Sequence, residues 1–216
     1  MKNLRLCVAL VLLCPVAAAA QTVTAVTDPA SNITIKVAND FATRVFQDPW
    51  DMSQKTDVGP FLGSADTSAN GWGTFTFTGG LFTGTTSASD AQLWFLDTSN
   101  PNAEPLGKNG ANFPIDASTY KVFAVRMTRP DSASSTQSQV ITWPSNIYES
   151  SPTTHFHTTA QFGGTGIYFL NLGASANWTG TQRALRFQPT VVSGETVSVD
   201  WARLVPAGDS NSCQPI

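Results

Sequence analysis

The stretch VSVDWARL, residues 197–204, decides the fold class of this chain. Apolar residues alternate with polar residues from Val197 to Trp201, as they do in a strand that buries one face. In that alternation Val197, Val199 and Trp201 share one face, and Asp200 interrupts the run with a single carboxylate. We therefore predict a closing β-strand that carries one placed acid.

Strand-like segments recur upstream of this stretch at the spacing of a β-sandwich. Residues 71–84, GWGTFTFTGGLFTG, predict a hairpin that turns at Gly79 and Gly80. Residues 121–128, KVFAVRMT, are apolar on both faces and predict a central strand. The sequence predicts no amphipathic helix, so the expected fold class is all-β, an antiparallel β-sandwich of the jelly-roll type.

Two shorter segments between the predicted strands need separate interpretations. Residues 43–46 predict a strand, which is followed by an ordered loop with Trp50 as a core plug. Residues 114–120, PIDASTY, predict a short helical turn with Asp116 as its cap.

The N-terminal residues predict export. Lys2 and Arg5 precede an apolar run that ends in four alanines, which is typical of a signal peptide over residues 1–20, cleaved after Ala20. No later segment approaches the ~20 apolar residues of a membrane span. We expect a secreted protein, extracellular or periplasmic, with one sandwich domain over residues 21–206 and a short polar tail over 207–216.

Charge and cysteine content narrow the range of partners. The chain has 12 basic and 15 acidic residues, and loss of Lys2 and Arg5 leaves 10 against 15, a net charge of −5. This charge argues against nucleic acid and anionic membranes, and it favours a neutral glycan over a polyanionic one. Cys213 is the one cysteine outside the signal peptide, so it is either a tolerated exposed thiol or a site of self-association.

Several pieces of the mature chain occur in an order that resembles the bacterial carbohydrate-binding jelly-roll modules of the galactose-binding-like domain superfamily. The pieces are NDF, a WD loop, PIDASTYKVFAVRM, QVITW, GIYFLNL, W-x-G followed by ALRFQP, and VSVDWARL. The resemblance covers most of the mature chain. It implies a secreted, non-catalytic protein that recognises a polysaccharide or a cell-surface glycan.

The resemblance also implies a structural calcium between an acid near the first strand and an acid in the last strand. These acids correspond to Asp40 and Asp200. The family often has a second early carboxylate, but Ala42 occupies a neighbouring position here, so backbone carbonyls would have to complete the calcium shell. In the alternative interpretation, Asp200 caps backbone N–H groups or pairs with Arg203 or Arg186.

Glycan binding requires flat aromatic faces, on which the C–H face of a sugar stacks, together with polar partners for its hydroxyl groups. Four aromatic residues near strand ends or in loops are the candidates, although each of them is also a candidate for core packing. They are Trp143, Tyr148, Trp178 and Trp72.

Three alternatives remain open at this point. A polysaccharide-degrading enzyme would need paired carboxylates or a base with a basic partner, and no such motif stands out, so the sequence favours a non-catalytic protein. A structural or adhesive extracellular subunit would make its contacts through Cys213 or an edge strand. His155 and His157 alternate on a strand and are placed to share a metal, but no third ligand is identifiable, and histidines without a metal are the other interpretation.

Overall fold

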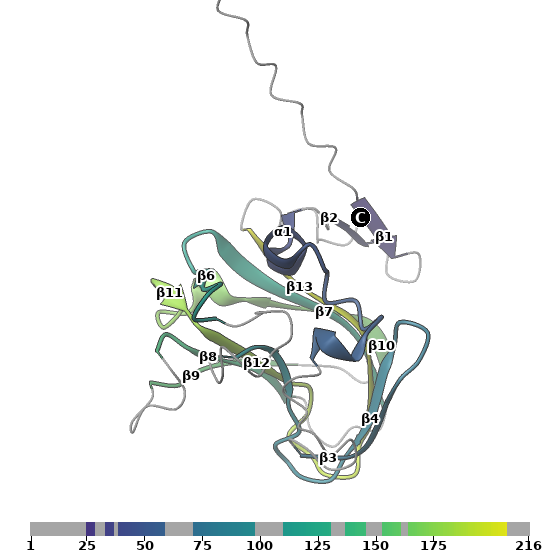
Figure 1. The fold of residues 1–216 in the computed structure, drawn as a ribbon. Coiled ribbons are helices and arrows are strands. Elements are labelled where there is room, and N and C mark those ends of the chain that lie inside the picture. The colour runs from purple at the N-terminus through teal and green to yellow at the C-terminus, as the bar shows by residue number, and fades with distance from the viewer. Residues whose placement is uncertain are drawn as a thin grey trace, which may run out of the picture.

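A computed structural model shows two antiparallel β-sheets that face one another (Figure 1). The described residues are 25–28, 33–36, 39–58, 71–97, 110–130, 137–145, 153–160 and 164–206. The predicted signal peptide, Tyr148 and Cys213 lie outside them. The all-β, antiparallel sandwich that the sequence predicts is confirmed.

The first sheet has five strands in the order β10-β7-β13-β4-β3. Their bounds are β3 (Trp72–Phe77), β4 (Phe82–Thr86), β7 (Tyr120–Arg129), β10 (Gly164–Asn171) and β13 (Thr196–Pro206). The predicted central strand is confirmed, because β7 pairs with both β10 and β13. The predicted hairpin is β3–β4, and its turn uses Gly79 and Gly80 at φ values of 62° and 76°, where side chains with a Cβ are disfavoured.

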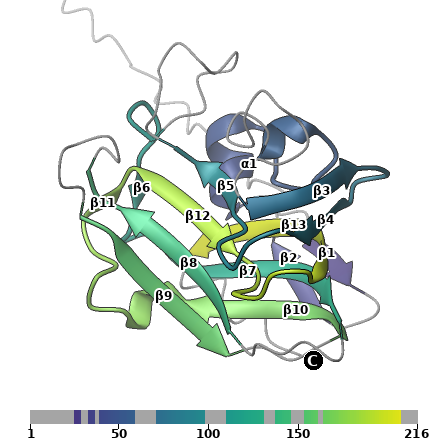
Figure 2. The ribbon, with the colours of Figure 1, turned by 90° about the horizontal axis from the view of Figure 1, so that it is seen from below.

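The second sheet has four strands in the order β5-β12-β8-β9, and Figure 2 shows them side by side. Their bounds are β5 (Leu93–Leu96), β8 (Gln137–Trp143), β9 (His155–Ala160) and β12 (Ala184–Gln188). Two small ribbons and three short helices complete the described structure. They are β1 (Ala25–Asp28) with β2 (Ile33–Lys36), β6 (Ile115–Asp116) with β11 (Thr181–Gln182), α1 (Phe41–Phe46), η2 (Lys55–Asp57) and η5 (Leu172–Ala174). None of the described helices is long and apolar enough to cross a membrane.

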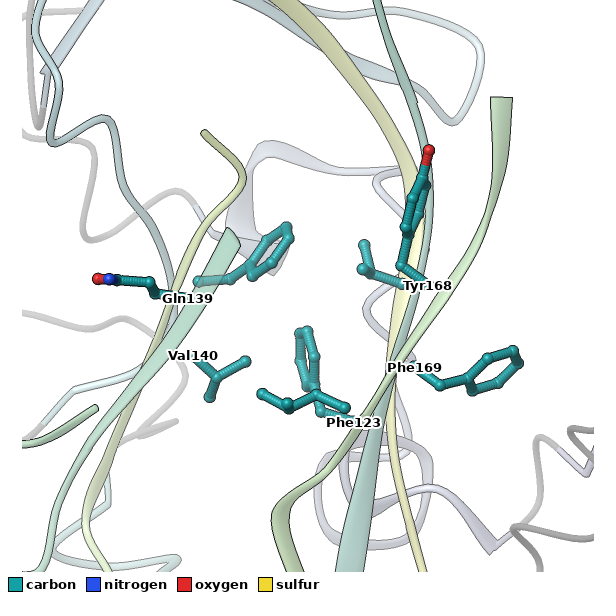
Figure 3. A pocket seen from close by; sticks show the side chains of 8 residues that line it. Phe123, Gln139, Val140, Tyr168 and Phe169 are labelled. Carbon is teal, nitrogen blue, oxygen red and sulfur yellow. The ribbon is translucent and has the colours of Figure 1, made fainter. Parts of the chain in front are cut away.

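Aromatic rings from both sheets form the core between them. Phe123 on β7 lies 5.9 Å from Phe95 on β5 and 5.5 Å from Phe187 on β12, measured between ring centroids. Trp50 packs against Phe95 at 4.9 Å and is 1% exposed, as the prediction of a core plug requires. Phe123 and Val140 point toward one another from the two sheets (Figure 3), and the apolar gap beside them is about 10 Å³, which is too small for a ligand.

The strand predicted over residues 43–46 is wrong, because this segment belongs to helix α1. Asp40 is the N-cap, and its Oδ2 accepts hydrogen bonds from the Thr43 N–H at 3.0 Å and the Thr43 hydroxyl at 2.9 Å. An aspartate at this position satisfies one of the free N–H groups of a helix start. The helix ends at Gln47 in the left-handed conformation, with φ of 57°.

The helical turn predicted over residues 114–120 is also wrong in its type. Ile115 and Asp116 form strand β6, and a non-helical turn follows. Asp116 nevertheless has the capping role that was predicted, since its Oδ1 accepts from the Ser118 N–H at 2.8 Å and its Oδ2 accepts from the Thr119 hydroxyl at 2.8 Å.

The prediction that Val197, Val199 and Trp201 share one face is wrong for Trp201. The pairing of β13 with β7 shifts between Val199 and Trp201, which marks a β-bulge at Asp200. A bulge inserts one residue and reverses the alternation beyond it. Val197 and Val199 therefore lie in the main core, whereas Trp201 packs on the other face with Val122.

A buried ion pair joins β7 to the loop that precedes β13. Arg129 Nη2 donates to Glu195 Oε2 at 3.1 Å, and the Thr190 hydroxyl donates to the same oxygen at 2.6 Å. The Glu195 N–H donates to the Thr86 hydroxyl at 3.0 Å, which adds β4 to the network. The side chains of Arg129 and Glu195 are 0% and 9% exposed. Solvent therefore cannot replace the ion pair when one of the two residues is substituted.

We expect Glu195→Ala to lower the free energy of unfolding by about 3–5 kcal/mol, because it removes the carboxylate that pairs with the buried Arg129 guanidinium. Urea denaturation followed by circular dichroism measures the loss. The matched control is Asp200→Asn, which removes the ion pair with Arg126. The side chains of Arg126 and Asp200 are 29% and 32% exposed, so the expected loss of free energy of unfolding is less than about 1 kcal/mol. Equal losses in the two variants would contradict the role of the buried pair.

Candidate functional site

The outer face of the four-stranded sheet holds a group of side chains that we call the outer-face cluster: Trp94, Trp143, Arg186, Asp90 and Gln92. Trp94 on β5 lies opposite Arg186 on β12, and β12 also pairs with β8, which ends at Trp143. The outward direction follows from the alternation of each strand.

Core packing fixes that alternation on both β5 and β12. Leu93 and Phe95 flank Trp94 and lie in the main core, and Leu185 and Phe187 do the same on either side of Arg186. Trp94 and Trp143 belong instead to a separate cluster on the opposite face of the sheet.

The two indoles and the guanidinium of the cluster stack on one another. The rings of Trp94 and Trp143 are 5.1 Å apart with an angle of 18° between their planes. The Arg186 Cζ lies 5.5 Å from the Trp94 ring centroid and 5.6 Å from that of Trp143. A cation at this distance from an indole is attracted by the negative face of the ring, so Arg186 holds both rings in place.

Hydrogen bonds connect the polar members of the cluster in a chain. Arg186 Nη2 donates to Asp90 Oδ1 at 3.1 Å, and Gln92 Nε2 donates to Asp90 Oδ2 at 2.6 Å. The Trp94 Nε1–H donates to Gln92 Oε1 at 2.9 Å, which fixes the ring orientation. Burial lowers the pKa of Arg186 and the Asp90 carboxylate raises it, but a guanidinium stays charged at any physiological pH.

Exposure within the cluster differs between its members. The side chain of Asp90 is 55% exposed and that of Arg186 is 13% exposed. Trp94 is half-buried, whereas Trp143 is 7% exposed. Asp90 and Trp94 are therefore the members of the cluster that solvent reaches most readily, whereas Arg186 and Trp143 are largely covered.

Of the four aromatic residues predicted to bind a ligand, the structure places Trp143 in the outer-face cluster. Trp72 is 0% exposed, and its Nε1–H donates to the Gln92 carbonyl at 2.8 Å, so it supports the strand beside the cluster. Trp178 is 4% exposed, and its Nε1–H donates to the Tyr120 carbonyl at 2.7 Å. In this structure Trp72 offers no open ring face to a ligand, and ligand binding by Trp143 stays a prediction.

Trp178 nevertheless lies at a hollow in the surface. Together with Lys121 and Thr179 it lines a depression of about 250 Å³, which lies between the turn before β7 and the loop after η5. The indole edge is covered by its bond to Tyr120, so this hollow presents little aromatic surface.

Sequence reasoning predicted only Trp143 among the five members of the cluster, and it missed Trp94, Arg186, Asp90 and Gln92. Trp94 lies within the apolar run LWFL, where it resembles a core residue. The signal that was available is alternation, because a strand that buries Leu93 and Phe95 must direct Trp94 to the other face. The same argument applies to Arg186 between Leu185 and Phe187.

The two predicted calcium ligands have other partners in this structure. Asp40 is fully buried, and its Oδ1 accepts from the Leu204 N–H at 2.9 Å while its Oδ2 caps α1. Asp200 forms an ion pair with Arg126 across the outer face of the five-stranded sheet. Leu204 and Asp200 are four positions apart on β13, a span of roughly 13 Å in an extended strand.

No three His, Cys, Asp or Glu side chains gather in a metal-binding arrangement within the described ranges. A structural calcium stays a prediction of the sequence. The test is the thermal midpoint of the protein with added calcium and with a chelator, and equal midpoints would exclude it.

Comparisons with known proteins gave matches among solved structures alone. No protein-family model matches the chain, and no curated protein matches it. Carbohydrate-binding modules of family 29 are among the similar structures. A mutant module complexed with cellulohexaose has a TM-score of 0.39 at 10% identity, over 69% of this chain and 92% of that chain.

A second mutant module of the family, complexed with mannohexaose, has a TM-score of 0.37 at 11% identity, over 69% of this chain and 92% of that chain. A third, the family 29 module, has a TM-score of 0.39 at 10% identity, over 69% of this chain and 89% of that chain. Similarity at this level identifies no ligand for this chain.

We expect Asp40→Ala to lower the free energy of unfolding by about 2–4 kcal/mol, because it removes a helix cap and leaves the buried Leu204 N–H without an acceptor. Urea denaturation measures the loss. Asp116→Ala is the matched control, since Asp116 caps an exposed turn, and its loss should be smaller. Similar losses in the two variants would show that the bond to Leu204 contributes little.

Proposed function

We propose that this protein is a secreted, non-catalytic carbohydrate-binding protein that recognises a polysaccharide or cell-surface glycan through the outer face of its four-stranded sheet. The observation that supports this proposal is the outer-face cluster, in which Arg186 and Trp143 hold the half-buried Trp94 ring in a fixed orientation. Trp94 lies at the partly exposed margin of a small apolar cluster on this face, where an ordered aromatic ring gives a ligand a surface to pack against.

The aromatic part of the cluster matches the apolar part of a sugar. A pyranose ring has faces of C–H groups, and these pack against the flat face or edge of an indole. The Trp94 ring is held by its hydrogen bond to Gln92 and by its stack with Trp143, so a sugar that binds to it would not have to immobilise it first. Preorganisation of this kind lowers the entropic cost of binding.

The polar part of the cluster matches the hydroxyl groups of a sugar. The exposed Asp90 carboxylate has acceptor capacity beyond its bonds to Arg186 and Gln92, and a carboxylate forms strong hydrogen bonds with hydroxyl donors. The charges of Arg186 and Asp90 compensate one another. The cluster therefore favours a neutral glycan, as does the net charge of the mature chain.

The carboxylate count of the cluster supports binding without catalysis. Hydrolysis of a glycosidic bond generally uses two carboxyl groups on either side of the bond. The outer-face cluster has one, Asp90, and both of its oxygens already accept hydrogen bonds from the protein.

We expect Trp94→Ala to weaken glycan binding by about tenfold or more, because it removes the stacking surface of the site. Binding of the wild-type protein to a broad glycan array identifies the ligand, with cellulohexaose and mannohexaose, the ligands of the similar modules, as the first soluble probes. Isothermal titration calorimetry on the best ligand then measures the variant. Calcium and chelator arms of the array test the predicted calcium at the same time.

Phe169→Ala is the matched control for Trp94→Ala. Phe169 is a partly buried aromatic residue on the outer face of the other sheet, and it points away from the core gap in Figure 3. This variant should bind as the wild type does. Wild-type affinity in Trp94→Ala, with an unchanged urea midpoint, would place the site elsewhere, and a blank array for the wild type would reject glycan recognition.

A further inference from the structure

The only two histidines of the chain lie on one edge strand with a single residue between them. His155 and His157 belong to β9, which is the last strand of the four-stranded sheet. His155 lies opposite Thr142 and His157 lies opposite Val140 on β8. Since Val140 is a core residue and alternate residues share a face, both imidazoles are on the inner side of the sheet, away from the outer-face cluster.

Each of these histidines has a buried ring nitrogen that lacks a hydrogen-bond partner. In the described part of the chain, the Nδ1 atoms of both His155 and His157 are buried and bind no donor or acceptor. His157 is 4% exposed, with its Nε2 at 3.2 Å from the Thr142 hydroxyl and its ring edge-on to Trp178 at 5.8 Å. A buried polar atom without a partner destabilises the folded protein, so two such atoms on one strand call for an explanation.

The state of the rings is compatible with metal binding. Burial, and then the neighbouring His155, lowers the pKa of His157 to about 4, so this ring is neutral at neutral pH. A neutral imidazole is the form that coordinates metals, and it suits copper and zinc. His155 is half-buried and lies at the free edge of the sheet, which gives an ion a path to the pair.

We propose that His155 and His157 form a two-nitrogen binding site for a divalent transition metal ion of the copper and zinc class, with the Nδ1 atoms as ligands. Within the described ranges no third His, Cys, Asp or Glu joins the pair. This site is on the opposite face of the sheet from the proposed glycan site. It is independent of the predicted calcium, since calcium prefers oxygen ligands.

The composition of the chain makes the test direct. Untagged mature protein with Cys213→Ser has His155 and His157 as its only imidazoles and no thiol. Titration with Cu²⁺ alone should give one bound equivalent, whose electron paramagnetic resonance spectrum shows coupling to two imidazole nitrogens. Binding should also quench tryptophan fluorescence, because Trp178 contacts His157.

The variants His155→Gln and His157→Gln separate a metal site from a packing role. Each should lose the two-nitrogen signal, and the thermal midpoint that Zn²⁺ raises in the wild type should not respond in either. His155→Gln keeps the proposal testable if the more buried His157 is needed for folding. Trp94→Ala should bind copper as the wild type does. The proposal would be overturned if the wild type showed no saturable copper binding, or if His155→Gln kept the two-nitrogen spectrum.

Discussion

Asp40 is fully buried, and its carboxylate joins two parts of the chain that are 164 positions apart in sequence. One oxygen caps helix α1 and the other accepts the Leu204 N–H of the closing strand. Arg203, on the same strand, donates to the Trp50 carbonyl at 2.9 Å, and the Ala202 N–H donates to that carbonyl at 2.8 Å. Burial raises the pKa of Asp40, while the charge of Arg203 and the hydrogen bonds from Leu204 and Thr43 lower it. The ionised form of Asp40 therefore depends on these neighbours.

This attachment of residues 40–50 to β13 determines where the aromatic core lies. Trp50 follows the helix and packs on Phe95, which in turn packs on Phe123 and Phe187. These contacts commit one face of β5 and one face of β12 to the interior. The outward positions of the same strands are then fixed as well, which is how Trp94 and Arg186 come to lie next to Trp143. The geometry of the candidate site is thus a consequence of core packing on the other side of a single sheet.

The parts of the fold that depend on local pattern were predictable, and those that depend on distant partners were not. The β3–β4 hairpin and the central strand β7 follow from alternation and glycine placement. The cap of helix α1 is a local signal, since Asp40 bonds to Thr43, but the bond from Leu204 to the other oxygen of Asp40 is not revealed by any local pattern. Trp72 and Trp178 lie among glycines and polar residues and resemble exposed loop aromatics. In the structure both are buried, and the backbone carbonyls of Gln92 and Tyr120, distant in sequence, accept their N–H groups.

Strand β8 links the two proposed sites and also keeps them separate. Trp143 at its end belongs to the outer-face cluster, while the neighbouring Thr142 faces inward and contacts His157 at 3.2 Å. Successive residues of a strand point to opposite faces, so a glycan on one side and a metal ion on the other have no shared surface to compete for. A substitution at Trp94 removes no contact of the histidines, and one at His155 removes no contact of the indoles. Loss of both activities in either variant would therefore indicate damage to the sheet itself and not to a site.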